Sequence, residues 1–84
     1  MTLEEAVNLT KQFTQKPSNE ELLKLYALYK QATEGDNLGE RPGGFDFKAA
    51  AKYNAWIALK GKDKTVAESE YVALVANLAT KYIS

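Results

Sequence analysis

The stretch Leu25-Tyr-Ala-Leu-Tyr-Lys-Gln-Ala-Thr-Glu-Gly-Asp36 decides the fold, because it predicts the second half of a helix that ends at Gly35. Tyr29 and Lys30 follow Tyr26 by three and four positions, so the three side chains share one side of this helix. Each tyrosine offers a flat apolar face and a hydroxyl, and the lysine offers a positive charge. This side is a candidate surface for an anionic ligand, although tyrosines at such spacing are more often half-buried packing residues.

Two helices are expected in the first half of the chain, and each begins at a capping box. In this motif a Ser or Thr and the Glu three positions later satisfy each other's backbone N–H groups. Thr2-Leu-Glu-Glu5 begins a predicted helix over 2–14, which has to end before Pro17. Ser18-Asn-Glu-Glu21 begins a predicted helix over 19–34.

The second half is predicted to hold two further helices after a glycine-rich loop. Residues 35–46 contain four glycines and one proline, and we expect this long loop to be both a crossover connection and part of the functional region. Asp46 is expected to cap a helix that ends near Lys60, and Asp63 is expected to cap a helix over 64–82. No segment shows the alternation of a strand, so we predict an all-α bundle with one long connection.

Composition excludes several kinds of chemistry. The chain has 84 residues, which is the size of one small domain, and it has no cysteine and no histidine. It therefore lacks the thiolate, the usual general base near neutral pH and the commonest metal ligand. We predict no catalytic residue, no metal site and no cofactor.

Charge is unevenly spread along a chain whose formal net charge is zero. Residues 48–64 carry five lysines against Asp63 alone. This local excess favours a small multi-anionic ligand over a nucleic acid, unless the lysines are simply solvated. The N-terminus has acids where a signal peptide has basic residues, and no stretch approaches the roughly 20 apolar residues of a membrane span. We expect a cytoplasmic monomer without stable membrane insertion.

Four stretches resemble the acyl-CoA-binding protein family in order and in spacing, and the similarity spans almost the whole chain. They are Tyr29-Lys-Gln-Ala-Thr-Glu-Gly-Asp36, Arg41-Pro-Gly-Gly-Phe-Asp-Phe-Lys48, Lys52-Tyr-Asn-Ala-Trp56 and Leu59-Lys-Gly61. The resemblance implies one domain over 1–84, folded as a four-helix up-down-down-up bundle with one long crossover loop. It also implies an intracellular carrier and pool former for medium- to long-chain fatty acyl-CoA esters.

The resemblance further implies a set of ligand-binding residues. Tyr26, Lys30 and Lys52 match family positions that hold the ribose 3′-phosphate, and Tyr29 matches the position that contacts the adenine. The complete set is Lys11, Tyr26, Tyr29, Lys30, Lys52 and Tyr71. Such a ligand suits these residue types, because acyl-CoA joins roughly four negative charges to a flat base and an apolar tail.

Two other functions compete with a carrier at this point. An enzyme would have to use carboxylates such as Asp36, Glu40 or Asp46, which loops and helix caps hold routinely. A small helical protein-interaction module without a lipid ligand would expose an apolar patch to its partner. Trp56, the only tryptophan, is interpreted either as a core residue or as a residue with one indole face near the ligand.

Overall fold

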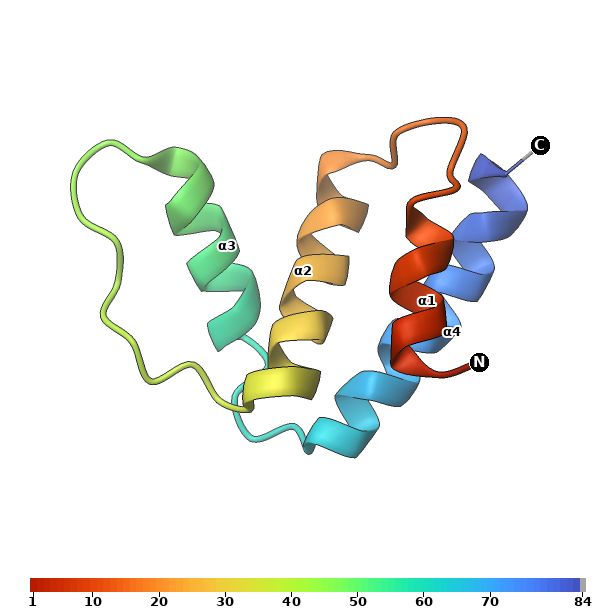
Figure 1. The fold of residues 1–84 in the computed structure, drawn as a ribbon. Coiled ribbons are helices and arrows are strands. Elements are labelled where there is room, and N and C mark those ends of the chain that lie inside the picture. Colours follow the sequence, from red (N-terminus) through yellow and green to blue (C-terminus); the bar gives the residue numbers. More distant parts are fainter. Residues whose placement is uncertain (84) are drawn as a thin grey trace.

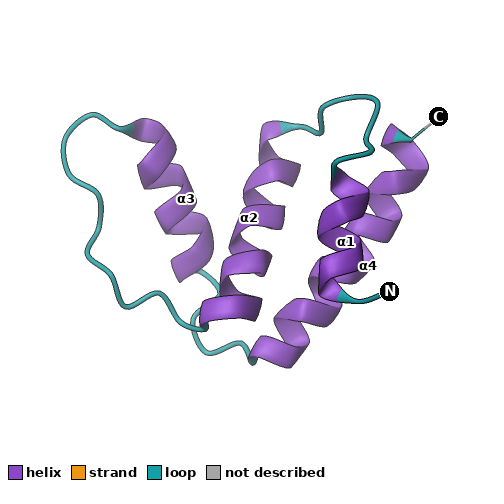
Figure 2. Ribbon diagram, in the orientation of Figure 1, coloured by secondary structure: helices purple, strands orange, loops and turns teal. Residues whose placement is uncertain are grey.

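A computed structural model describes residues 1–83 and contains only helices and loops over that range (Figure 2). The helices are α1 (Leu3–Thr10), α2 (Asn19–Glu34), α3 (Phe47–Ile57) and α4 (Lys64–Tyr82). In the view of Figure 1 they run up, down, down and up, and the long connection between α2 and α3 returns the chain to the other end. The predicted all-α, up-down-down-up topology with one crossover loop is confirmed.

Capping chemistry fixes most of the helix starts. The Thr2 and Ser18 hydroxyls each accept a backbone N–H bond of 3.1 Å from a glutamate three positions later, so both predicted capping boxes are present. Asp46 caps α3 by accepting the N–H of Ala49 at 3.0 Å. Asp63 occupies the N-cap position of α4, but its side chain makes no capping hydrogen bond, so that part of the prediction is wrong.

Two helices end earlier than predicted. Helix α1 ends at Thr10 and α3 at Ile57 because the next residues form tighter turns with bonds between residues three apart. The N–H of Gln12 donates to the Leu9 carbonyl, and the N–H of Lys60 donates to the Ile57 carbonyl. The ends at Glu34 and Tyr82 agree with the prediction, and Gly35 closes α2 with a φ of 79°.

Helix α2 is the centre of the molecule, with α3 on one side and α4 on the other (Figure 1). Helix α1 packs on α4, whereas α3 contacts α2 alone among the described helices. The core cluster joins α1, α2 and α4 and consists of Ala6, Leu25, Leu28, Ala67, Tyr71, Val75 and Leu78. Helix α3 contributes no buried residue. None of the described helices is long and apolar enough to cross a membrane.

Hydrogen bonds at the end of α2 hold the last turn of α3 and the connection that follows it. The fully buried Gln31 donates from Nε2 to Asp36 Oδ1 at 2.9 Å and to the Lys62 carbonyl at 2.8 Å. Asp36 Oδ1 also accepts the N–H of Gly61 at 2.8 Å, which together with the Gln31 bond lowers the pKa of Asp36. The Trp56 indole N–H donates to the Gly35 carbonyl at 2.9 Å. These bonds hold α3 against α2.

Candidate ligand-binding site

Two lysines from different helices converge on one tyrosine ring. Lys30 Nζ, from α2, lies 5.9 Å from the centroid of the Tyr26 ring, and Lys52 Nζ, from α3, lies 5.3 Å from it. Lys30 Nζ also lies 5.6 Å from the centroid of the Trp56 ring. An aromatic face attracts a cation, so these rings position the two ammonium groups and leave donors available for an anion. The convergence of two lysines makes this spot a candidate anion site.

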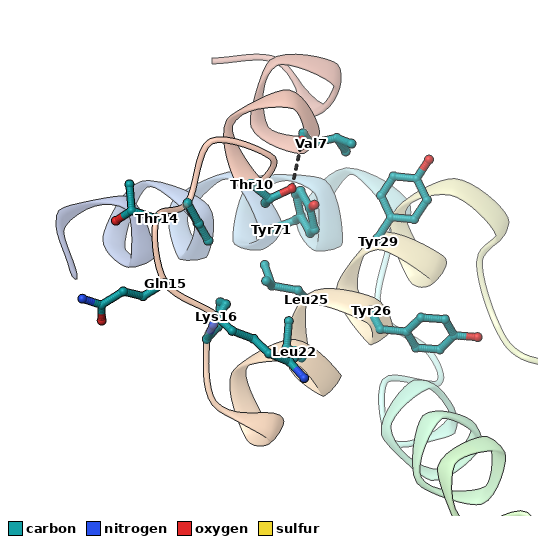
Figure 3. Close-up of a pocket in the computed structure, with 12 residues that line it drawn as sticks. Val7, Thr10, Thr14, Gln15, Lys16, Leu22, Leu25, Tyr26, Tyr29 and Tyr71 are labelled. Atoms are coloured by element: carbon teal, nitrogen blue, oxygen red, sulfur yellow. Dashed lines mark hydrogen bonds between the residues drawn. The ribbon is translucent and has the colours of Figure 1, made fainter. Parts of the chain in front are cut away.

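A cavity of about 560 Å³ opens on one side of Tyr26. Tyr26 and Tyr29 reach it from α2 and Tyr71 reaches it from α4 (Figure 3). The Tyr29 and Tyr71 rings lie 5.8 Å apart between centroids, and burial raises the pKa of Tyr71. The other lining residues are Val7, Thr10, Phe13, Thr14, Gln15, Lys16, Pro17, Leu22 and Leu25. The cavity therefore offers several aromatic faces to a flat group.

A second cavity of about 450 Å³ lies between α2 and the start of α3. It shares Lys16, Leu22 and Tyr26 with the first cavity, so the two adjoin at these residues. Its remaining lining residues are Asn19, Leu23, Phe47, Lys48, Ala51 and Lys52. The lining contains three lysines and no acidic residue. A lining that combines apolar side chains with lysines suits an apolar chain that carries anionic groups at one end.

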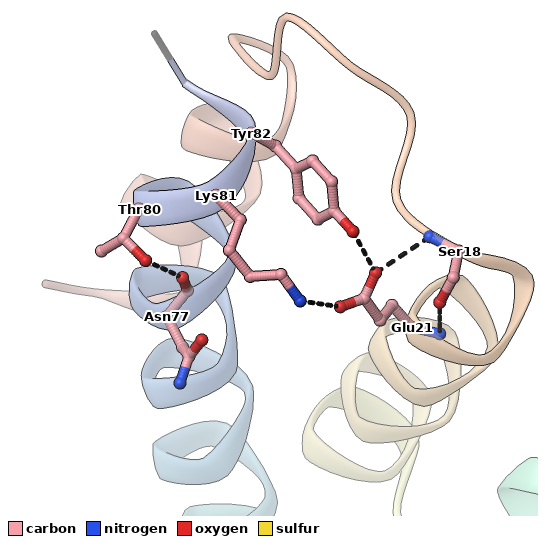
Figure 4. Close-up of polar contacts among 6 residues, drawn as sticks. All are labelled: Ser18, Glu21, Asn77, Thr80, Lys81 and Tyr82. Carbon is pink, nitrogen blue, oxygen red and sulfur yellow. Dashed lines mark hydrogen bonds and ion pairs between the residues drawn. The ribbon is translucent and has the colours of Figure 1, made fainter.

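Hydrogen bonds from the end of α4 hold the connection between α1 and α2, which lines part of the first cavity. The Tyr82 carbonyl accepts the Thr14 N–H at 2.6 Å and the Thr14 hydroxyl at 2.7 Å. The Tyr82 hydroxyl donates to Glu21 Oε1 at 2.6 Å, and Lys81 Nζ donates to Glu21 Oε2 at 2.9 Å (Figure 4). The hydrogen bond from Tyr82, followed by those from Ser18 and Lys81, lowers the pKa of Glu21 to about 2. The segment between Phe13 and Ser18 is thereby held at both ends.

The structure brings together five of the six predicted site residues. Tyr26, Tyr29 and Tyr71 line the first cavity, and Lys30 and Lys52 lie at the Tyr26 ring. Lys11 is exposed at the C-cap of α1 and is not among the residues that line the described cavities.

Two lysines that line these cavities were not among the predicted ligand-binding residues. Lys48 lines the second cavity and could have been found, because it precedes Lys52 by one helical turn. Lys16 lines both cavities, but it was not among the predicted ligand-binding residues. Trp56 is half-buried and bonded to the Gly35 carbonyl, and its ring lies beside Lys30, so both interpretations of Trp56 stay predictions.

Comparison with known proteins agrees with this geometry. Residues 2–75 match the family model described as acyl CoA binding protein. The chain belongs to the acyl-CoA-binding protein family. The acyl-CoA-binding protein of Dictyostelium discoideum is 57% identical over 81 residues, which cover 96% of this chain and 96% of that protein. The acyl-CoA-binding protein of Saccharomyces cerevisiae is 53% identical over 81 residues, which cover 96% of this chain and 93% of that protein.

A solved member of the family has the same fold. The crystal structure of Oryza sativa acyl-CoA-binding protein 2 superposes with a TM-score of 0.88 at 40% identity. The match covers 94% of this chain and 88% of that structure. The family resemblance of the four sequence stretches is therefore confirmed by sequence and by structure.

Proposed function

We propose that residues 1–84 form one acyl-CoA-binding domain that carries medium- to long-chain fatty acyl-CoA esters in the cytoplasm as a monomer. The observation that carries this proposal is the convergence of Lys30 and Lys52 on the Tyr26 ring, where two cavities adjoin. Membership of the family and the similarity to acyl-CoA-binding proteins of other organisms give independent support. The domain binds its ligand without changing it chemically.

Each part of the ligand has a counterpart in the site. The ribose 3′-phosphate binds Lys30 and Lys52 beside Tyr26, where two ammonium groups from different helices make charge-assisted hydrogen bonds. The adenine lies in the first cavity against Tyr29 and Tyr71. Lys11 stays a proposed contact at the outer edge, because its long side chain is exposed at the end of α1.

The acyl chain occupies the second cavity, over the apolar side chains of Leu22, Leu23 and Ala51. Each buried CH₂ contributes about 0.8 kcal/mol, so burying ten carbons contributes about 8 kcal/mol before ordering costs. The tail therefore gives a long-chain ester a large advantage over CoA alone. Affinity has to stop rising once the cavity is full.

Calorimetric titration with CoA and a series of acyl-CoA esters tests this function. We expect binding of one ligand per chain, with affinity that rises with acyl length to a plateau. Ala51→Phe narrows the second cavity, so it should weaken palmitoyl-CoA binding and leave CoA binding nearly unchanged. Ala76→Phe, at an exposed position of α4, is the matched control. If CoA bound as tightly as its palmitoyl ester, the tail cavity would be refuted.

A second assay tests whether the thioester of the ligand stays intact in the presence of the protein. The protein is incubated with palmitoyl-CoA, and free thiol is measured over time. A carrier leaves the thioester intact, so thiol should accumulate no faster than in buffer. Release of thiol in proportion to protein concentration would show hydrolysis and contradict a pure carrier.

A further inference from the structure

Lys30, one of the two cations proposed for the phosphate, already has an anionic partner within its own helix. Its Nζ lies 2.7 Å from Glu34 Oε2, and the two residues are one helical turn apart. The side chains are 32% and 52% exposed. The hydrogen bond to Glu34 is the main cause of the raised pKa of Lys30. A ligand anion that reaches Lys30 therefore meets a competing carboxylate.

The second cation of the site differs in this respect. Lys52 Nζ lies against the Tyr26 ring, and no ion pair to it occurs among residues 1–83. The ammonium of Lys30 lies near the Tyr26 and Trp56 rings and is also bonded to Glu34. The site thus combines one cation open to a ligand with one that is already neutralised.

The helix dipole does not favour an acidic residue at position 34, although the ion pair with Lys30 one turn earlier offsets part of that cost. Glu34 is the last residue of α2. The C-terminal end of a helix carries partial negative charge, so an acidic side chain there is unfavourable and a cation is preferred. The contact that Glu34 does make points to the ligand site, because Lys30 faces Tyr26 and Trp56.

We propose that Glu34 limits the affinity of the site by competing with the ligand's phosphate for Lys30. The inference rests on the proposed acyl-CoA-binding function. A phosphate monoester carries nearly two negative charges at neutral pH and three acceptor oxygens, so it displaces a single exposed carboxylate. During release the Lys30–Glu34 pair forms again and replaces the contact to the phosphate. Such a residue suits a carrier, which has to give up its ligand.

Glu34→Gln tests the proposal, because it preserves size and removes the charge. An exposed ion pair of this kind is weak, so we expect palmitoyl-CoA to bind about two- to fivefold more tightly at low salt. Most of the change should appear as slower dissociation in stopped-flow displacement. With 3′-dephospho-palmitoyl-CoA, which lacks the competing group, the variant and the parent should bind equally.

The matched control is Glu68→Gln, which changes net charge by the same amount at an exposed position of α4. Glu68→Gln should leave the affinities for palmitoyl-CoA and for 3′-dephospho-palmitoyl-CoA unchanged. Equal tightening by both variants would assign the effect to overall charge and overturn the proposal. Unchanged or weaker binding by Glu34→Gln would overturn it as well, since Glu34 would then be neutral or would orient Lys30. Failure of the parent protein to bind palmitoyl-CoA would instead refute the proposed function.

Discussion

Helices α3 and α4 both pack on α2, yet they contribute different things to the molecule. Helix α4 places Ala67, Tyr71, Val75 and Leu78 in the core, whereas α3 buries no residue. Helix α3 instead carries Lys52 toward the site and begins with Phe47, which is 78% exposed. The comparison indicates that α4 belongs mainly to the core, although its Tyr71 also lines the first cavity, and that α3 belongs to the proposed site rather than to the core. Substitutions on the two helices should therefore affect different measurements.

The number of neighbours explains the difference. Helix α4 lies against both α1 and α2, so two of its sides are covered. Helix α3 has one helical neighbour among the described residues, and hydrogen bonds near Trp56 hold its end. The second cavity lies between α2 and α3, so the first residues of α3 line a cavity instead of joining the core.

The largest expected effect is a loss of stability from the α4 side. Leu78 is 2% exposed, so Leu78→Ala should lower the free energy of unfolding by about 2–5 kcal/mol. The matched change on α3 is Ile57→Ala, at a half-buried position, and it should cost less. Urea unfolding of both variants measures the contrast. Equal losses would show that α3 belongs to the core as fully as α4 does.

The sequence predicts the helices and their packing only in part. The bounds of α2 could be predicted because Ser18, Glu21 and Gly35 are local signals for a helix start and a helix end. The early end of α1 has no such signal, since Thr14 bonds to the Tyr82 carbonyl, 68 residues away. Pairings across that distance depend on packing, which a local pattern does not contain.

The site shows the same limit. Tyr26, Tyr29 and Lys30 could be grouped by helical spacing, whereas the approach of Lys52 to Tyr26 depended on family resemblance. The two cavities, and the part played by Lys16 in both, follow from how α2, α3 and the segment before α2 meet. The Lys30–Glu34 pair, in contrast, has the spacing of a helical ion pair and was open to prediction.

A smaller effect on stability is expected at Glu21, which links the start of α2 to the end of α4. The folded-state pKa of Glu21, about 2, lies below its ordinary value of 4.5. Ionised Glu21 therefore stabilises the fold fully above pH 4.5, and this contribution is lost as pH falls from 4.5 toward 2. Glu21→Gln should melt lower than the parent at pH 7, and the two melting temperatures should converge in acid. Parallel curves across this range would contradict the assignment.

The smallest effect on stability is expected for the hydrogen bond that links Trp56 of α3 to Gly35 at the end of α2. Trp56→Phe keeps an aromatic ring but removes the indole N–H that donates to the Gly35 carbonyl. Loss of this hydrogen bond should cost about 0.5–1.5 kcal/mol of stability, measured by urea unfolding. A cost as large as that of Leu78→Ala would place Trp56 in the main core and weaken the contrast between the two helices.

The most direct test of the discrete phosphate site is a double-mutant cycle at Lys30 and Lys52, measured by titration with palmitoyl-CoA. Each alanine variant should weaken binding by about 1.5–3 kcal/mol, with the smaller loss at Lys30 because Glu34 already neutralises it. The losses should be non-additive if, as proposed, both side chains contact one phosphate. Melting temperatures should change little. Binding of the 3′-dephospho ester should be nearly the same for the parent and for both variants.

Lys64→Ala is the control for that cycle, because Lys64 is exposed at the start of α4 and outside both cavities. We predict nearly unchanged binding for Lys64→Ala beside clear, non-additive losses at Lys30 and Lys52. Equal losses at all three lysines, with the 3′-dephospho ester affected as strongly as palmitoyl-CoA, would show diffuse electrostatic attraction. That result would contradict a discrete phosphate site between α2 and α3.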